Sequence, residues 1–232
     1  MIGIDAGSTN IKIVDEQGFK KYPIFKLSEV LEKYNKDEVF ATGYFRKRFK
    51  NHITEITAAI YGINREVDVI IDIGGQDTKI INTRTLEFIM NDKCGAGTGL
   101  FMQTMAMYLN IPIEDFGKYY SKNPLELNNT CAVFSISEII SYLVNGYSVK
   151  DIVASINYTI AKKMANMNPY ECDIIALIGG VAENKAFVKY FKEITEKDIY
   201  VPKNPQFINA IGARIYGIEH STKNHLWNLW FV

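Results

Sequence analysis

Two cysteines of this chain stand where a reactive or metal-binding sulfur would be useful. Cys94 lies in NDKCGAGTG, directly before a run of small residues, and Cys131 lies in NNTCAVFSISEII, among small and hydroxyl residues. Each precedes a segment with a helical pattern. Free N–H groups and the helix dipole at such an N-terminus favour an anion, so they favour a thiolate over a thiol at both positions.

The residues leave three interpretations of these thiols open. The chain has three cysteines, and most cysteines in a reducing cytosol are buried structural residues. A nucleophile needs a nearby base, but His52, His220 and His225 lie in no motif. As metal ligands, two cysteines are too few for a four-thiolate site unless a symmetric dimer supplies the other two. The third cysteine, Cys172, directly precedes a predicted core strand and has no assigned role.

A second set of candidate residues lies in two hairpins that match each other. Aligning Asp5 with Asp72 places IDAGSTNIKIV over IDIGGQDTKII, so that an aspartate, a glycine, a lysine and the flanking β-branched residues coincide. In both hairpins Asp-x-Gly lies between apolar strands, and a lysine follows five residues after the glycine. The repetition predicts an internal duplication and two related lobes.

Loops of this composition suit phosphate. Glycine and hydroxyl residues in a tight turn let N–H and O–H groups approach phosphate oxygens, while an aspartate at the strand end can hold Mg²⁺ through water. The candidates are Gly7, Ser8, Thr9 and Lys12 in the first hairpin and Gly74, Gly75, Gln76 and Asp77 in the second. Lys12 and Lys79 could face phosphate or be solvated strand residues. Taken singly, each hairpin could also be an ordinary turn, because Asp, Gly, Ser and Asn are common in turns.

A third glycine segment, IGGVAEN, follows a predicted buried strand and adds the candidates Gly179, Gly180, Val181 and Asn184. The three segments resemble the phosphate 1, phosphate 2 and adenosine motifs of the superfamily that contains actin, hexokinase and the heat-shock chaperone ATPases. EITAAIYG (55–62) and NAIGA (209–213) resemble its two connecting helices. The resemblance implies an α/β fold of two RNase H-like lobes with ATP or ADP and Mg²⁺ in a cleft between them. It implies no particular reaction.

Hydrophobic periodicity predicts the elements that position these residues. Strands are expected at 2–5, 11–15, 20–25, 38–44, 173–180 and 198–202, and helices at 27–35, 51–62, 99–109, 148–167, 184–194 and 205–218. We therefore expect lobe I at 1–66, with a helix at about 206–232 packing back on it, and lobe II at 67–205, carrying the cysteines.

Two of these helices have a specific predicted pattern. The helix at 99–109 presents Phe101, Met105 and Tyr108 at helical spacing. The helix at 148–167 opens with a capping pair, Ser148 and Asp151, and then repeats an apolar residue every fourth position from 152 to 164. Both helices are therefore expected to bury one face.

Composition argues against some classes of function. Lys plus Arg and Asp plus Glu each total 26, so no global positive charge favours nucleic acid. No apolar run approaches the roughly 18 residues that span a bilayer, and the opening MIGIDAGSTN lacks the basic region and cleavage site of a secretory signal. We therefore expect a cytoplasmic protein that binds neither nucleic acid nor membrane.

Four segments carry a more specific resemblance. In this order, DIGGQDTK, MNDKCGAGTG, CAVFSISEIIS and GGVAEN are similar to segments of the activators of 2-hydroxyacyl-CoA dehydratases and the related benzoyl-CoA reductase ATPases. The resemblance implies an ATPase that donates a low-potential electron to a dehydratase or reductase iron–sulfur component, with ferredoxin or flavodoxin as the electron source. It also implies a homodimer in which Cys94 and Cys131 of each subunit hold one bridging 4Fe-4S cluster. The implied catalytic residues are Asp5, Asp72 and Gln76.

Two other functions fit the same fold. A kinase for a sugar or a vitamin precursor needs a substrate-side general base and no metal cluster, and we identify no such carboxylate in the sequence. A non-enzymatic, actin-like ATP-binding protein would leave both thiols as packing residues. A dinucleotide site at GAGTG is disfavoured, because the spacing is G-x-G-x-G and no acidic residue ends a following strand about 20 residues on.

Overall fold

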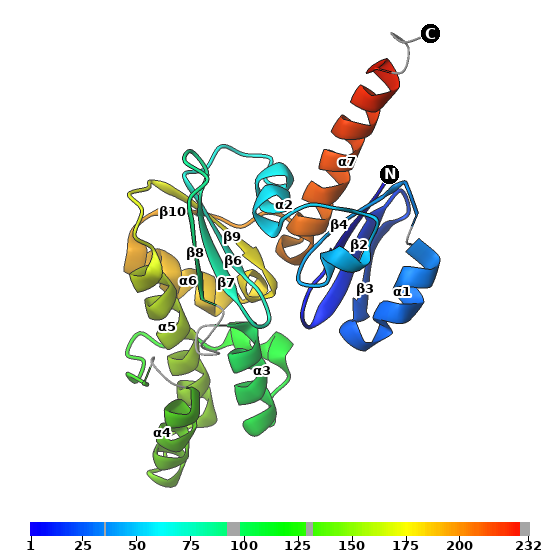
Figure 1. Cartoon of the computed structure of the whole chain (residues 1–232). Helices are drawn as coiled ribbons and strands as arrows, with labels where there is room; N and C mark the ends of the chain where they lie inside the picture. The colour runs from blue at the N-terminus through cyan, green and yellow to red at the C-terminus, as the bar shows by residue number, and fades with distance from the viewer. Residues whose placement is uncertain (35, 92–97, 129–131, 228–232) are drawn as a thin grey trace. The chain divides into compact units, whose positions relative to one another are not determined.

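The computed structural model describes residues 1–34, 36–91, 98–128 and 132–227 (Figure 1). The chain forms two compact units. Unit 1 comprises Met1–Glu66 and Gln206–Val232, and unit 2 comprises Val67–Pro205. The two predicted cluster ligands, Cys94 and Cys131, lie outside the described residues.

Unit 1 is built on a five-stranded mixed sheet with the order β3-β2-β1-β4-β5. Its strands are β1 (Ile2–Ala6), β2 (Asn10–Asp15), β3 (Gly18–Pro23), β4 (Val39–Thr42) and β5 (Asn51–His52). The first three strands form an antiparallel meander, whereas β4 runs parallel to β1 and β5 runs parallel to β4. The strand that carries Asp5 is therefore the central strand of the sheet.

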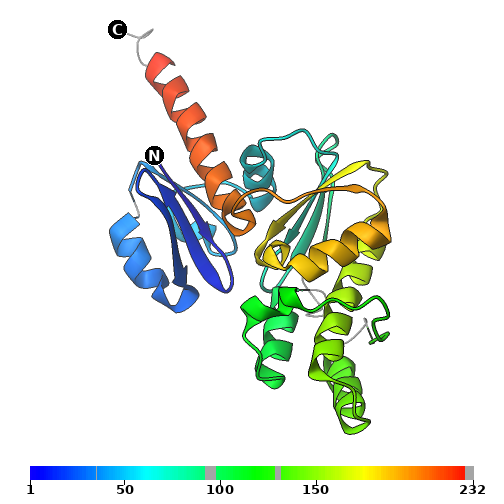
Figure 2. The ribbon, with the colours of Figure 1, turned by 180° about the vertical axis from the view of Figure 1, so that it is seen from behind.

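Helices cover both faces of this sheet. On one face lies α1 (Leu27–Tyr34), whose buried side chains share a core with residues of β1, β2 and β4. The long α7 (Ile208–Trp227) lies on the opposite face, as Figure 2 shows from behind. It packs against α2 (Glu55–Gly62), and Ala58 and Ala213 meet in a small apolar cluster. The end of the chain thus returns to the N-terminal sheet.

Unit 2 repeats this topology with the strand order β8-β7-β6-β9-β10. Its strands are β6 (Val69–Ile73), β7 (Thr78–Asn82), β8 (Phe88–Asn91), β9 (Ile174–Gly179) and β10 (Asp198–Tyr200). Again the first three form an antiparallel meander, β9 runs parallel to β6, and β10 runs parallel to β9. The duplication that the hairpin sequences predict therefore extends to all five strands of each sheet.

Four helices accompany the second sheet: α3 (Gly99–Tyr108), α4 (Ala132–Val144), α5 (Val149–Met167) and α6 (Lys185–Thr195). Ser148 caps α5 as predicted, because its Oγ accepts a hydrogen bond of 3.2 Å from Asp151 N. The predicted repeat from Ile152 to Met164 is fully buried in the main core with α6 and alternate residues of β6. The lower end of α5 projects away from the sheet together with α4 (Figure 1).

Local predictions failed at two places in unit 1. The third strand ends at Pro23, which has no N–H for a further ladder bond, and a 3-10 turn (Ile24–Lys26) follows where strand was expected. The helix expected from residue 51 begins only at Glu55, because β5 occupies the first two positions. Thr54 then caps the helix, and its Oγ1 accepts a bond of 3.1 Å from Thr57 N.

In unit 2 the predicted apolar stripe of α3 is confirmed in part. Phe101 and Met105 are buried, but Tyr108 is 48% exposed, and Ala106 contributes to the buried face instead. Strand β8 was not predicted, because its apolar residues show no alternation. Across the described ranges of the whole chain, no helix combines the length and apolar character that a bilayer crossing requires.

Candidate nucleotide and cluster site

The two predicted catalytic aspartates hold the same position in the two sheets. Asp5 lies opposite Lys12 in the β1–β2 pairing, and Asp72 lies opposite Lys79 in the β6–β7 pairing. Both aspartates are almost fully buried, with exposed fractions of 4% and 5%. A buried carboxylate is costly unless a cation or hydrogen-bond donors offset its charge. The two strand ends are therefore matching places for a cation or a polar ligand.

The first loop, 7–9, gathers the residues predicted to contact phosphate. A hydrogen bond of 3.2 Å from Gly7 N to Asn10 O closes it. Lys12 reaches across the hairpin, so that its Nζ lies 2.8 Å from Asp5 Oδ2, and a Cβ placed on Gly7 would lie 3.4 Å from the same Nζ. The two hydroxyl residues of the loop are half-buried. A carboxylate, a cation, a glycine and two hydroxyls thus meet in one turn.

The second loop, 74–77, is built in the same way but holds its lysine differently. Gly74 N donates to Asp77 O at 2.9 Å, and Lys79 Nζ lies 2.7 Å from Asp77 Oδ2. Gln76 is exposed at the loop. The predicted residues of this loop therefore lie together beside Asp72, but the carboxylate of Asp77 is already paired with a lysine.

The second loop is also bonded to helix α3. Gly99 N donates to Gly74 O at 2.9 Å, and Leu100 N donates to Gly75 O at 2.7 Å. N–H groups in the first turn of a helix have no partner within the helix, so the loop carbonyls cap α3. The helix predicted directly after Cys94 begins at Gly99, and residues 95–97 lie outside the described part of the chain.

In each unit, a glycine with positive φ packs closely against the aspartate at the strand end. Gly179, with φ of 87°, follows β9, and a Cβ there would lie 2.3 Å from Ile73 O and 2.9 Å from Asp72 Oδ1. Gly43, with φ of 94°, follows β4, and a Cβ there would lie 2.5 Å from Asp5 Oδ1. No side chain fits at either point. Sequence reasoning found Gly179 but missed Gly43, although a glycine after a strand, in ATGY, was the available signal.

The side-chain amide of Asn184 bonds to both α5 and α6. Its Oδ1 caps α6 by accepting a bond of 2.9 Å from Phe187 N, and its Nδ2 donates to Asn157 Oδ1 at 2.8 Å. Asn157, which is fully buried in α5, donates from Nδ2 to the carbonyl oxygens of Phe116 and Tyr119. Sequence reasoning missed Asn157, whose signal was a polar residue among the buried positions of α5. In this structure Asn184 anchors the 179–181 turn to the core.

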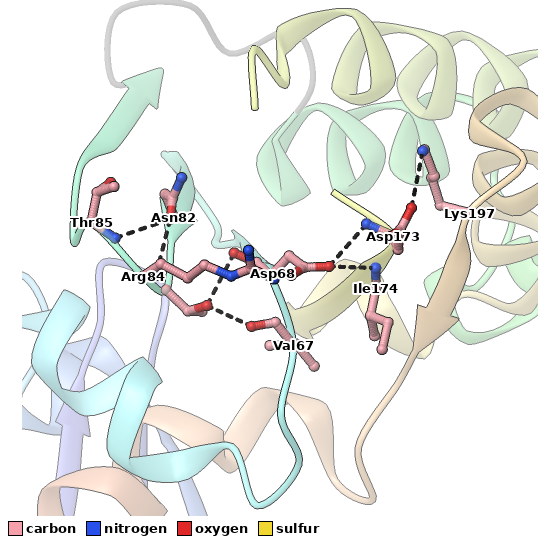
Figure 3. Close-up of polar contacts among 9 residues, drawn as sticks. Val67, Asp68, Asn82, Arg84, Thr85, Asp173, Ile174 and Lys197 are labelled. Carbon is pink, nitrogen blue, oxygen red and sulfur yellow. Dashed lines mark hydrogen bonds and ion pairs between the residues drawn. The ribbon is translucent and has the colours of Figure 1, made fainter. Parts of the chain in front are cut away.

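Cys172 lies at the other end of the second sheet, before β9. Burial raises the pKa of its thiol, and Asn168 Nδ2 donates to its sulfur at 3.4 Å. It lines a cavity of about 710 Å³ together with Asp68, whose carboxylate accepts bonds from the backbone N–H groups of Asp173 and Ile174 (Figure 3). These features describe a structural thiol.

The predicted metal ligands receive no test from this geometry. Within the described residues, no group of three or more His, Cys, Asp and Glu side chains is arranged to hold a metal ion. Cys94 and Cys131 lie outside them. What the described residues offer is two loops with buried carboxylates and adjacent cations, and a glycine turn beside each.

A profile of the BadF/BadG/BcrA/BcrD ATPase family matches residues 30–217. The chain belongs to this family. This BadF/BadG/BcrA/BcrD ATPase family member is 32% identical over 256 residues to the (R)-2-hydroxyglutaryl-CoA dehydratase activating ATPase of Acidaminococcus fermentans, and the match covers 96% of this chain and 98% of that one. The resemblance to dehydratase activators that the four sequence segments indicated is thereby confirmed.

Solved structures show the fold of this BadF/BadG/BcrA/BcrD ATPase family member independently. The activator of the 2-hydroxyisocaproyl-CoA dehydratase from Clostridium difficile, with bound ADPNP, is 30% identical and superimposes with a TM-score of 0.84 over 97% of this chain and 96% of that one. MreB 5 of Spiroplasma citri is 14% identical and shares the fold alone, with a TM-score of 0.51 over 98% of each chain. The predicted actin-like ATPase fold is confirmed.

Proposed function

We propose that this protein is an ATP-dependent activator that passes a low-potential electron to a partner iron–sulfur enzyme such as a 2-hydroxyacyl-CoA dehydratase. The chief support is the pair of hydrogen bonds that joins Gly74 and Gly75 to the start of α3, the helix that follows the Cys94 segment. A nucleotide at this loop would have a direct mechanical route toward that cysteine. Similarity to dehydratase activators supports the choice of partner.

ATP with Mg²⁺ is the proposed ligand of the loops 7–9 and 74–77 and of the turn 179–181. The residues fit this ligand, because glycine turns let the backbone approach phosphate and the buried Asp5 and Asp72 lie beside them. Bound Mg²⁺ would neutralise charge on the phosphates. The two aspartates would hold its water ligands and orient the attacking water, with help from the exposed Gln76. Asn184, predicted with these residues, would also position the turn through its amide bonds.

Cys94 and Cys131 are the proposed ligands of one 4Fe-4S cluster shared by two copies of the chain. The donor set fits, because two thiolates from each chain of a homodimer make the four sulfur ligands of such a cluster. Helix α4 begins at Ala132, directly after Cys131, and helix N-termini favour an anionic group. The bound cluster would supply a one-electron carrier. Ferredoxin or flavodoxin is the proposed electron source, and a dehydratase or reductase is the proposed recipient.

The residues of the chain would convert the nucleotide state into movement of α3. Its first N–H groups bond to the loop carbonyls, so a shift of Gly74 and Gly75 on phosphate contact must carry the helix N-terminus with it or break those bonds. The nucleotide can drive such a change only as far as it binds the two arrangements with different affinities. ATP and ADP should therefore differ in their effect on the cysteine-bearing segment.

Anaerobic purification followed by an iron assay and an absorption spectrum tests the proposal. We expect about two irons per chain and a broad brown absorbance, as for one 4Fe-4S cluster per two chains. Both signals should be lost in Cys94→Ser and in Cys131→Ser but kept in Cys172→Ser, because Cys172 lies beside β9 among other partners. A colourless anaerobic protein that phosphorylates a sugar or a vitamin precursor would instead identify a kinase.

A further inference from the structure

A second cation of unit 1, Arg46, lies on the turn that bonds to Ala6, just before the first loop. Arg46 opens a 3-10 helix (Arg46–Arg48) after β4, and its side chain folds back over the preceding turn. The carbonyl oxygen of Gly43 accepts two bonds from this residue, one of 3.2 Å from its backbone N and one of 3.1 Å from Nη1. The guanidinium is therefore fixed against the turn and is only partly exposed.

That turn is itself attached to the first loop. Phe45 N donates to Ala6 O at 2.9 Å, directly between Asp5 and Gly7 in the sequence. Gly43 fits so closely that a Cβ on it would lie 2.6 Å from Ala6 O and 2.5 Å from Asp5 Oδ1. The carbonyl that holds the guanidinium thus belongs to a turn in contact with the catalytic aspartate. All of these residues lie within unit 1.

The internal duplication identifies the turn in unit 2 that corresponds to the turn holding Arg46. Thr42 stands beside Asp5 in the β1–β4 register, as Ile178 stands beside Asp72 in the β6–β9 register, so Gly43 corresponds to Gly179. The turn that holds Arg46 is therefore the counterpart, in unit 1, of the turn proposed to contact the nucleotide in unit 2. Counting on from the matched glycines, Arg46 corresponds to Ala182, which is buried and uncharged. Unit 1 alone has a cation at this place.

Arg46 has no carboxylate partner among the residues that the structure describes. Lys12, the other cation of the first loop, forms an ion pair with Asp5. Among residues 1–34, 36–91, 98–128 and 132–227, no carboxylate forms an ion pair with Arg46, and one of its five N–H groups is used by Gly43 O. A planar guanidinium with free donors is the preferred protein partner of a phosphate.

We propose that Arg46 contacts a phosphate group of the bound nucleotide, through the N–H groups that Gly43 leaves free. This assignment rests on the proposed nucleotide role of the loops and adds a residue that their motifs do not include. Anchoring by the Gly43 carbonyl fixes the side chain before the ligand arrives, so little conformational entropy is lost on binding. Lys47 and Arg48, the next two residues of the same 3-10 helix, are exposed, and the described part of the chain provides no such anchor for them.

These neighbours supply matched controls. Arg46→Gln, Lys47→Gln and Arg48→Gln each remove one positive charge from the same short segment, so a difference among them isolates contact from net charge. Isothermal titration calorimetry of the full chain with ADP should show about tenfold weaker binding for Arg46→Gln. The two control variants should change affinity less than about twofold. Arg46→Lys should recover part of the loss, because it restores the charge without the planar fork.

Adenosine separates a phosphate contact from a distorted site. Arg46→Gln should bind adenosine as the wild-type chain does, because adenosine has no phosphate for the guanidinium to contact. Equal weakening by all three glutamine variants, or weakening for adenosine as strong as for ADP, would overturn the assignment. If Arg46→Gln binds ADP as tightly as the wild-type chain does, the Arg46 assignment is also overturned, but the proposed function is not affected. Failure of the wild-type chain to bind ADP or ADPNP would overturn the proposed function itself.

Discussion

Lys12 and Lys79 hold the same register position in their hairpins, and the ammonium group of each lies in an ion pair with a carboxylate. Lys12 Nζ lies 2.8 Å from Asp5, and Lys79 Nζ lies 2.7 Å from Asp77 in its own loop. The side chain of Lys12 is 19% exposed, whereas that of Lys79 is 6% exposed. We therefore expect the first lysine to serve the ligand and the second to hold the loop together.

Charge removal at the two lysines tests this division. Lys12→Gln should weaken ADP binding about tenfold, and Lys79→Gln should weaken it much less, because the Lys79 side chain is more deeply buried and pairs with Asp77. Lys79→Gln should lower the free energy of unfolding by about 1 to 3 kcal/mol, because it leaves a partly buried carboxylate without its cation. Calorimetric titration and urea denaturation measure the two effects. Adding Asp77→Asn to Lys79→Gln should recover part of the stability, and no recovery would speak against the pair.

Alanine substitutions at two glycines with positive φ should lower stability by different amounts. Gly179→Ala should cost several kcal/mol, because the new Cβ would meet a backbone carbonyl at 2.3 Å in addition to the strain of positive φ. Gly18 also has positive φ, but a Cβ there meets nothing within 4 Å, so Gly18→Ala should cost only the backbone strain, about 1 to 2 kcal/mol. Urea denaturation of both variants checks this. Equal losses would mean that the close approach at Gly179 contributes nothing.

The parts of the fold that could be predicted are those where the local residue pattern fits a single type of structure. Asp-x-Gly twice in one chain predicted both hairpins, and the register of Asp5 with Lys12 and of Asp72 with Lys79 confirms the alignment. The long α5 was predicted because its apolar residues recur once per turn over the whole helix. In these segments local pattern and tertiary packing agree, so the sequence is sufficient.

The missed parts depend on packing that the sequence does not display. Strand β8 lies at the sheet edge with Phe88, Ile89 and Met90 all exposed, so no alternation of burial marks it. The duplication would have predicted it, since β3 holds the matching place in the first sheet. Asn184 was predicted as a nucleotide-binding residue from its motif, and the structure adds that its amide bonds to Asn157 and to the start of α6. A motif identifies a segment and does not say which way each side chain points.

The buried amide of Asn157 predicts a linked loss of stability and affinity. Asn157→Leu should lower the free energy of unfolding by about 2 kcal/mol or more, because it leaves the carbonyls of Phe116 and Tyr119 and the amide of Asn184 without this partner. It should also weaken ADP binding several-fold, because Asn184 then anchors the 179–181 turn less firmly. Thermal unfolding and calorimetric titration give the two readouts.

A second variant of α5 is the control for that prediction. Ser155 is fully buried. Its Oγ accepts a hydrogen bond from Leu125 N and donates one to Asp151 O, and neither bond involves the 179–181 turn. Ser155→Ala should therefore lower stability, by about 1 kcal/mol, and leave ADP affinity unchanged. If both variants change affinity in proportion to their stability loss, Asn157 has no specific link to the turn.

Asp68 should make unit 2 less stable in acid over a defined range of pH. Its pKa lies below the ordinary value of 3.8, chiefly because its carboxylate accepts hydrogen bonds from Ile174 N and Asp173 N, with Arg84 a smaller influence (Figure 3). A carboxyl group whose pKa is lowered on folding stabilises the folded state fully above its unfolded pKa. That contribution is lost as the pH falls below 3.8 toward the folded pKa.

Comparison with Asp68→Asn isolates this group from the other carboxylates. Between about pH 5 and pH 7 the wild-type chain should be more stable than the variant by a constant amount, because Asp68 is ionised in both the folded and unfolded states there. Below pH 3.8 the difference should narrow, since protonation removes the charge that the backbone N–H groups favour. Urea denaturation at a series of pH values gives both curves. A difference that narrows already between pH 7 and pH 5, or that stays constant down to about pH 2, would contradict a lowered pKa for Asp68.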